Sequence, residues 1–132
     1  MKVLVIENSS AICERLLALL SESGRYEGLG CVTCAVAAIE LIEDCRPDAL
    51  LLDLRLSDGS GFKVLEALRS QNLSLPVIAL SDCDGWQYQI RSLALGAAAF
   101  LCKATQSDLI IPSLDRLLGI RNDAVAVLEA KS

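Results

Sequence analysis

Short apolar runs alternate with amphipathic segments along this 132-residue chain. Four of the runs are rich in Val, Leu, Ile and Ala, as buried strands often are, and a fifth run, GLGCV, is a weaker strand signal. The five runs cover residues 2–6, 28–32, 48–53, 76–80 and 97–102. The third run is apolar from Ala49 to Leu52, which is typical of a strand that is buried on both faces in the middle of a parallel sheet.

Helices are predicted between these strands, because apolar residues recur there at helical spacing. The first predicted helix follows a capping residue at position 8, 9 or 10. The next three helices are predicted over residues 35–42, 62–70 and 84–95, and the last begins near residue 107 or 108. Trp86, Ile90 and Leu93 share one face of the fourth helix, which we expect to pack against the core, with a partner anchor as the alternative for Trp86. Pro112 lies inside the last segment, so this helix is expected to kink or to begin later.

Strands and helices thus alternate five times with short connections, which requires a parallel sheet covered by helices on both faces. We therefore predict an α/β fold with a doubly wound, five-stranded parallel sheet. With 53% hydrophobic residues, the chain can build one such domain. No apolar run approaches the roughly 20 residues that span a bilayer, so we expect a soluble, cytoplasmic protein without membrane contact.

Charge and composition exclude several functions. The net charge is −5, which makes the domain a poor partner for nucleic acid, so any contact with DNA would come from a separate domain. The chain contains no histidine, which excludes Ser-His and Cys-His catalysis and a role as a phosphohistidine carrier. Six cysteines without a secretory signal favour reduced thiols. Cys31 and Cys34 have the spacing of a redox motif, which is a weak signal and stays an alternative.

Polar side chains follow four of the predicted strands. They are Glu7 and Asn8 after the first strand, Asp53 at the end of the third, Ser81 after the fourth and Lys103 after the fifth. The carboxyl ends of parallel strands meet at one edge of a sheet, and ligands bind there. Two carboxylates can hold Mg²⁺ at this edge, and the ion together with an ammonium can neutralise a phosphoryl group in transfer. The pattern therefore predicts phosphoryl transfer, with Asp53 as the nucleophile.

These residues also make the chain resemble the receiver domains of bacterial response regulators over residues 1–118. The matching segments are VLVIENS, LLLDLRLSDGSGF, PVIALS and LGAAAFLCK, and the set is most similar to regulators that carry a helix-turn-helix output domain. The resemblance implies a flavodoxin-like receiver fold with strand order 2-1-3-4-5. Residues 119–132 would then be a linker or C-terminal extension. We expect the chain to be a fragment whose output domain is absent, with a stand-alone receiver that carries a short extension as the alternative.

The resemblance implies a role for each matched residue. Asp53 would accept a phosphoryl group from a partner histidine kinase or phosphotransfer protein, and Ser81 and Lys103 would bind the phosphoryl oxygens. Glu7, Asp53 and the backbone carbonyl of Arg55 would bind Mg²⁺.

Phe100 would be the aromatic switch that reports phosphorylation to the face formed by the fourth helix, fifth strand and fifth helix. Dimerisation is expected through the same face. The protein would be a two-component signalling switch that regulates an output domain or partner, with transcription as the expected process. It would catalyse its own phosphorylation and dephosphorylation without being a metabolic enzyme.

Two departures from the family pattern favour an alternative. Asn8 takes the place of a second acid, so it would be a doubtful metal ligand, and Mg²⁺ binding is expected to be weak. Ser57 replaces a proline, which predicts a less rigid loop. The alternative is a pseudo-receiver that binds partners without phosphorylation. A flavin-binding domain of the same topology is less favoured, because ENSSAI lacks the glycine of a phosphate-binding turn.

Overall fold

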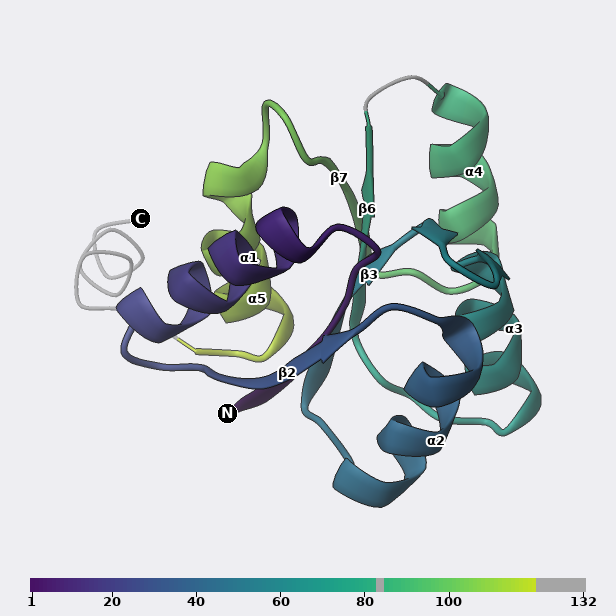
Figure 1. The fold of residues 1–132 in the computed structure, drawn as a ribbon, viewed down its shortest axis with the longest axis horizontal. Helices are drawn as coiled ribbons and strands as arrows, with labels where there is room; N and C mark the ends of the chain where they lie inside the picture. The colour runs from purple at the N-terminus through teal and green to yellow at the C-terminus, as the bar shows by residue number, and fades with distance from the viewer. Residues whose placement is uncertain (83–84, 121–132) are drawn as a thin grey trace, which may run out of the picture.

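A five-stranded parallel sheet forms the centre of the molecule (Figure 1). The computed structural model describes residues 1–82 and 85–120. The strands are β1 (Lys2–Ile6), β2 (Glu27–Val32), β3 (Ala49–Asp53), β6 (Val77–Ser81) and β7 (Ala99–Cys102). Their order in the sheet is β2-β1-β3-β6-β7, which confirms the predicted fold class and the order 2-1-3-4-5.

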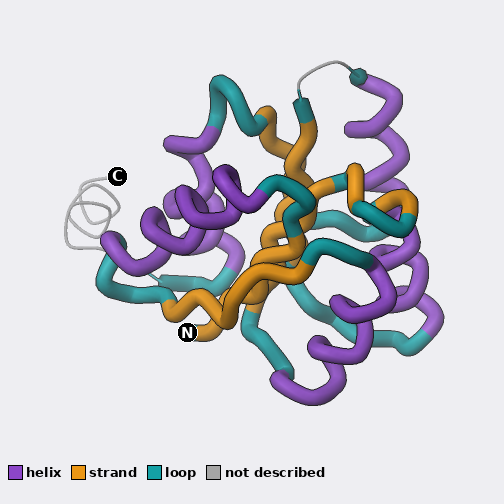
Figure 2. Tube along the Cα trace, viewed as in Figure 1, coloured by secondary structure: helices purple, strands orange, loops and turns teal. Residues whose placement is uncertain are grey.

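Helices cover both faces of this sheet (Figures 1 and 2). One face carries α1 (Ser10–Glu22) and α5 (Ile110–Leu117), and the other carries α2 (Ala35–Cys45), α3 (Phe62–Ser70) and α4 (Trp86–Ala94). Successive strand residues point to opposite faces and fill two separate cores. In β3, for example, Leu51 packs with α1 and α5, whereas Leu50 and Leu52 pack with α2 and α3.

The structure shows which residue caps α1 and how Pro112 is accommodated in α5. Ser9 is the N-cap of α1, because its hydroxyl oxygen accepts a hydrogen bond from the backbone N–H of Ile12 at 3.3 Å. A 3₁₀ turn, η1 (Ser107–Leu109), precedes α5. Because α5 begins at Ile110, Pro112 lies in its first turn, where a missing N–H costs no helical hydrogen bond.

The predicted loop 57–61 is more ordered than its composition suggests. Two short strands, β4 (Arg55–Leu56) and β5 (Gly59–Ser60), pair antiparallel around its turn. The backbone N–H and the hydroxyl of Ser57 both donate to the carbonyl oxygen of Thr33, at 3.0 and 2.9 Å. Ser57 thus binds this connection to the residue that lies two positions before α2, whereas its effect on the rigidity of the loop stays a prediction.

The apolar stripe of α4 faces solvent, which corrects the expectation that it packs on the core. Trp86, Ile90 and Leu93 are 68%, 59% and 44% exposed. The face that lies against the domain instead contains Ser92, which is fully buried, and Tyr88, whose ring stacks on Phe62 with centroids 5.8 Å apart. The alternative interpretation of Trp86, a partner anchor, is the one that its exposure favours.

Cys13 and Cys31 form a disulfide, which contradicts the expectation of reduced thiols for this pair. Cys31 pairs in register with Val5 of β1, and α1 packs over the same strands, so the two Cα atoms lie 6.1 Å apart. That separation suits a disulfide. Cys31 is therefore bonded to α1 rather than to Cys34 of its own CxxC motif, and Cys34 and Cys45 are free thiols.

The disulfide is expected to stabilise the fold, because it closes a loop between residues 18 positions apart. Replacing Cys31 with serine should lower the free energy of unfolding by about 3 kcal/mol through the entropy returned to the unfolded chain. Urea unfolding under oxidising conditions measures this change. Cys45→Ser is the matched control and should unfold like the wild type, whereas a wild-type midpoint for Cys31→Ser would contradict the prediction.

Hydrogen bonds and an ion pair connect the last helix, α5, to the residues that precede β2. Asp115 of α5 accepts hydrogen bonds from Arg25 at 3.1 and 2.7 Å and from the hydroxyl of Tyr26 at 2.6 Å. Burial, together with this carboxylate, raises the pKa of Tyr26, so the phenol stays neutral.

No helix in the described part of the chain has the length and apolar character needed to cross a membrane.

Candidate functional site

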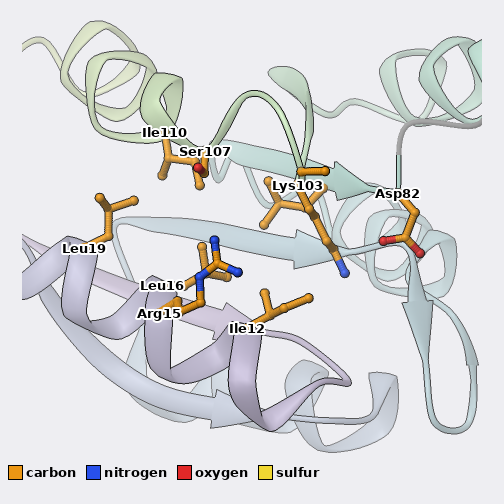
Figure 3. Close-up of a pocket in the computed structure, with 10 residues that line it drawn as sticks. Ile12, Arg15, Leu16, Leu19, Asp82, Lys103, Ser107 and Ile110 are labelled. Atoms are coloured by element: carbon orange, nitrogen blue, oxygen red, sulfur yellow. The ribbon is translucent and has the colours of Figure 1, made fainter.

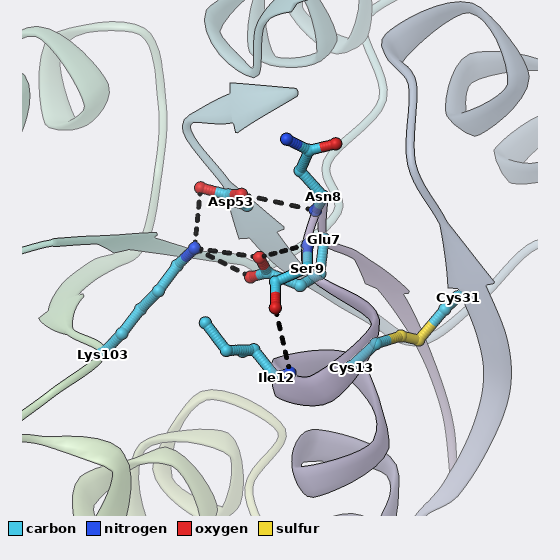
Figure 4. The surroundings of a disulfide bond; sticks show 8 residues. All are labelled: Glu7, Asn8, Ser9, Ile12, Cys13, Cys31, Asp53 and Lys103. Carbon is cyan, nitrogen blue, oxygen red and sulfur yellow. Dashed lines mark hydrogen bonds and ion pairs between the residues drawn. A yellow bond between two sulfur atoms is a disulfide. The ribbon is translucent and has the colours of Figure 1, made fainter. Parts of the chain in front are cut away.

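Three ionisable side chains from separate strands meet at the carboxyl edge of the sheet (Figure 4). Ile6 pairs with Leu52, so Glu7 and Asp53 follow neighbouring positions of β1 and β3. Lys103 follows β7, and its backbone N–H donates to the carbonyl oxygen of Ser81 at 2.9 Å. Sheet register therefore brings together residues that are up to 96 positions apart in the chain.

The ammonium of Lys103 lies between the two carboxylates (Figure 4). Its Nζ is 3.0 Å from Oε1 and 2.9 Å from Oε2 of Glu7, and 2.9 Å from Oδ1 of Asp53. The three side chains are 11%, 1% and 4% exposed, so water screens this cluster poorly. The sequence-based expectation that Lys103 faces Asp53 agrees with these distances, and its equally close contact with Glu7 was not foreseen.

Burial and hydrogen bonding act in opposite directions on the ionisation of Glu7 and Lys103. Burial raises the pKa of Glu7, and the nearby charge of Asp53 acts in the same direction, although the hydrogen bond from Lys103 opposes both. Burial lowers the pKa of Lys103, but its hydrogen bonds with Glu7 and Asp53 outweigh that effect and raise the pKa overall. Lys103 is therefore firmly protonated and acts as the counter-ion of two acids.

The two oxygens of Asp53 have different surroundings. Oδ1 accepts from Lys103 and from the backbone N–H of Arg55 at 3.0 Å. Oδ2 accepts only the backbone N–H of Asn8 among the described residues, at 3.4 Å. The side chain of Asn8 is exposed and points away from Lys103 (Figure 4). Oδ2 thus accepts fewer hydrogen bonds than Oδ1, and Asn8 contacts the site through its backbone.

The donor set partly fits a magnesium ion. Oε2 of Glu7 is buried and makes no hydrogen bond within residues 1–82 and 85–120, although it lies 2.9 Å from the ammonium of Lys103. Such an oxygen, with Asp53 and a backbone carbonyl, provides the hard ligands that Mg²⁺ prefers. However, the described residues contain no cluster of three acidic, histidine or cysteine side chains. The site therefore suits the ion but offers it only two carboxylates.

Ser81 and Phe100 lie beside the charged cluster. Ser81 ends β6 next to Asp53 and is 7% exposed, and its hydroxyl makes no hydrogen bond with a described residue. Phe100 of β7 is half-buried and packs against the core on the α2–α3 side of the sheet. These positions are compatible with the predicted roles but do not test them.

Sequence reasoning missed Gly61, which lies against the backbone of Asp53 at the end of β3. A β-carbon at this position would collide with the backbone carbonyl oxygen of Asp53, so only glycine allows the chain to pass so closely. The backbone N–H of Gly61 also donates to the carbonyl oxygen of Leu54 at 3.0 Å. The two glycines of the SDGSG segment were a signal for such a close approach.

The side chain of Arg55 connects this edge of the sheet to α4. Its guanidinium lies 3.6 Å from the carboxylate of Asp82 and 5.9 Å from the ring centre of Tyr88. Arg55 thus contacts Asp53 through its backbone and the start of α4 through its side chain.

Comparisons with known proteins agree on one family. A family model described as the response regulator receiver domain matches residues 3–115. The virulence transcriptional regulatory protein PhoP of Salmonella choleraesuis is 29% identical over 126 residues, which cover 96% of this chain and 55% of that protein. The two-component response regulator PhoP of Pseudomonas aeruginosa is 30% identical over 118 residues, covering 89% of this chain and 52% of that protein. The chain thus spans about half the length of these relatives.

Solved structures give the same result. The receiver domain of the Francisella response regulator 1452 superimposes with a TM-score of 0.77 at 28% identity, and the match covers 89% of this chain and 94% of that one. A LuxR-family two-component response regulator from Aurantimonas sp. has a TM-score of 0.83 at 16% identity, covering 92% of this chain and 86% of that one. At that identity the second likeness shows the fold alone.

Proposed function

The chain belongs to the response regulator receiver family, and on that premise we propose that it is a phosphorylation-dependent signalling switch. In this proposal, Asp53 accepts a phosphoryl group from a histidine of a partner kinase or phosphotransfer protein. The observation that carries the proposal is the ammonium of Lys103, which lies within 3.0 Å of oxygens of both Glu7 and Asp53. A phosphoryl group on Asp53 would bring its negative charge next to this cation.

The transfer is a substitution at phosphorus. Oδ2 of Asp53 attacks, the bond from phosphorus to the donor imidazole nitrogen breaks, and its electron pair stays on that nitrogen. Oδ2 suits this role because its hydrogen bond to the backbone of Asn8 is long, at 3.4 Å. Lys103 balances the charge on the phosphoryl oxygens, and the Ser81 hydroxyl, which has no hydrogen-bond partner among the described residues, donates to them.

Receiver domains generally bind Mg²⁺ at this acidic pocket, and here Glu7, Asp53 and the backbone carbonyl of Arg55 would hold it. When bound, the ion would neutralise charge on the phosphoryl group. Lys103 contacts both oxygens of Glu7, so it competes for the same carboxylate, and Asn8 adds no charge. Weak magnesium binding is the expected consequence.

Restoring the missing acid should strengthen magnesium binding. Asn8→Asp adds a carboxylate next to Glu7 and Asp53, and the extra Coulomb attraction should tighten the Mg²⁺ dissociation constant by about tenfold or more. Isothermal titration calorimetry measures the constant. Ser10→Asp adds the same charge on the exposed first turn of α1 and should have little effect. Equal affinity of Asn8→Asp and the wild type would contradict this account of the site.

Phosphorylation is expected to act on α4 and the neighbouring surface. Ser81 and Phe100 would move together when the phosphoryl group forms, and the contact of Arg55 with Tyr88 supports a second link to α4. The exposed side chains of Trp86 and Ile90 then favour a dimer through the face that α4, β7 and α5 form. In a longer protein, residues 119–132 would lead from α5 to an output domain that regulates transcription. Residues 121–132 lie outside the described structure.

Trp86 should anchor this dimer, because large aromatic side chains dominate protein interfaces. Trp86→Ser should weaken phosphorylation-dependent dimerisation about tenfold or more. Size-exclusion chromatography with light scattering, with and without a phosphoryl mimic, measures the association. Val36 on α2 is 63% exposed, so Val36→Ser is a control of similar exposure that should dimerise normally. A monomer under both conditions would refute the proposed interface.

Incubation of the chain with acetyl phosphate at increasing Mg²⁺ tests the proposed function. Intact-protein mass spectrometry should detect one added phosphoryl group, in an amount that rises with the magnesium concentration. The natural asparagine at position 8, in place of the second acid of the family pattern, favours one other candidate function. This candidate is a pseudo-receiver that binds partners without phosphorylation. No adduct at saturating Mg²⁺ would support that candidate and contradict the switch.

A further inference from the structure

A cavity of about 600 Å³ lies between α1 and the segment from Lys103 to Ile110 (Figure 3). Apolar side chains form most of its surface: Ile12, Leu16, Leu19, Leu80 and Ile110. Leu80 and Ile110 are each 1% exposed, so the cavity reaches the core on this face of the sheet. Its volume lies within the range of about 300–1,000 Å³ that is usual for pockets of small organic ligands.

Three charged side chains line the cavity, and only one of them lacks an ion-pair partner among the residues that the structure describes. Lys103 is paired with the two buried carboxylates of the site, and Asp82 lies 3.6 Å from Arg55. Arg15 makes no hydrogen bond or ion pair within residues 1–82 and 85–120. Its guanidinium extends from α1 toward the space between the two walls (Figure 3). Among the described residues, the exposed guanidinium of Arg15 is therefore the charged group at the cavity that remains available to pair with a ligand.

We propose that this cavity, the α1–α5 pocket, binds a small amphipathic carboxylate. The carboxylate pairs with Arg15, and the half-buried hydroxyl of Ser107, which has no described partner, donates a second hydrogen bond. The hydrocarbon or aromatic body of the ligand packs against Leu16, Leu80 and Ile110. An unpaired guanidinium selects an anion, and apolar walls select a body without polar groups, because such groups would lose their hydrogen bonds there.

Lys103 connects this pocket with the acidic site. It lines the α1–α5 pocket and also contacts Glu7 and Asp53. A bound carboxylate therefore places negative charge near the ammonium that would bind the phosphoryl oxygens, and occupancy of the pocket should slow phosphorylation. This second effect rests on the proposed function, whereas ligand binding does not.

Titration of the full chain with sodium octanoate tests the pocket. Calorimetry should give saturable binding at one site, and amide NMR shifts should concentrate in α1 and in residues 103–110. 1-Octanol, which has the same body without the charge, should bind at least about tenfold more weakly, as should octanoate to Arg15→Gln. Arg116 is an exposed arginine of α5 that does not line the cavity, so Arg116→Gln should bind like the wild type.

Leu19→Trp provides a second variant, because a larger side chain at this half-buried position fills the pocket. It should remove octanoate binding while its thermal unfolding stays cooperative. The proposal is overturned if octanoate does not saturate at millimolar concentration, if octanol binds equally well, or if Arg15→Gln keeps the wild-type affinity. Specific octanoate binding without any phosphoryl adduct would uphold the pocket and refute the proposed function.

Discussion

Asp53→Asn should abolish the phosphoryl adduct that we expect the wild-type chain to form with acetyl phosphate and Mg²⁺. The neutral amide lacks the nucleophilic oxygen, and it also removes one of the two carboxylates available to the metal. The fold should persist, because asparagine keeps the size of the side chain and its amide oxygen can still accept the shorter of the two hydrogen bonds, from the backbone N–H of Arg55. Intact-protein mass spectrometry measures the adduct.

Asp58→Asn is the matched control for this variant. Asp58 lies on the same connection between β3 and α3, but its exposed carboxylate accepts hydrogen bonds from the backbone of Ala35 and Val36 at 2.8 and 3.2 Å. Those bonds lower its pKa and tie the loop to the start of α2. The control should therefore form the adduct normally. An adduct of undiminished amount on Asp53→Asn would mean that another residue accepts the phosphoryl group.

Lys103→Met should destabilise the protein and make its stability depend on magnesium. The variant leaves Glu7 and Asp53 buried without a counter-ion, which costs about 3 kcal/mol of unfolding free energy near neutral pH. Mg²⁺ can replace the lost positive charge, and it no longer competes with an ammonium. The ion should therefore stabilise this variant more than it stabilises the wild type. Urea unfolding with and without Mg²⁺ measures both effects.

The cost of Lys103→Met should also depend on pH. The pKa of Glu7 is raised by burial, and by the charge of Asp53, even while Lys103 is present. When the pKa of a carboxyl is higher in the folded protein than in the unfolded protein, the stability that this carboxyl contributes is lost as the pH rises through the folded-state pKa. The variant should therefore be closest to the wild type in acid. Lys63→Met, at an exposed lysine of α3, should show neither the pH effect nor the magnesium effect.

The sheet and the charged cluster at its edge could be predicted because buried parallel strands leave a strong signal in the sequence. Residues 49–52 are apolar without interruption, and the polar residue that follows them must lie at the edge of the sheet. Alternation of strands and helices then fixes the fold class. The positions of Glu7, Asp53 and Lys103 after their strands therefore predict that these side chains meet at one edge of the sheet.

The orientation of α4 could not be predicted from the same kind of pattern. Periodicity shows that Trp86, Ile90 and Leu93 share a face, but it does not show whether that face points to the core or to solvent. The domain instead packs against Ser92 and the ring of Tyr88, which stacks on Phe62. An apolar stripe on a short helix was therefore mistaken for a core face.

Contacts that depend on strand register or on close packing also could not be predicted from the sequence. The Cys13–Cys31 disulfide requires α1 to lie over the pair that β1 forms with β2. The need for glycine at position 61 follows from the passage of its backbone beside Asp53. The double contact of Lys103 with Glu7 depends on side-chain conformations, which strand ends alone do not specify.

Locating the modified residue tests the central claim most directly. The wild-type chain is incubated with acetyl phosphate and Mg²⁺, and borohydride then reduces the acyl phosphate to an alcohol that tandem mass spectrometry of peptides can locate. We predict a single reduced position, Asp53, that disappears when Mg²⁺ is chelated before phosphorylation. Reduction at another carboxylate, or an unmodified Asp53 at saturating Mg²⁺, would contradict the account.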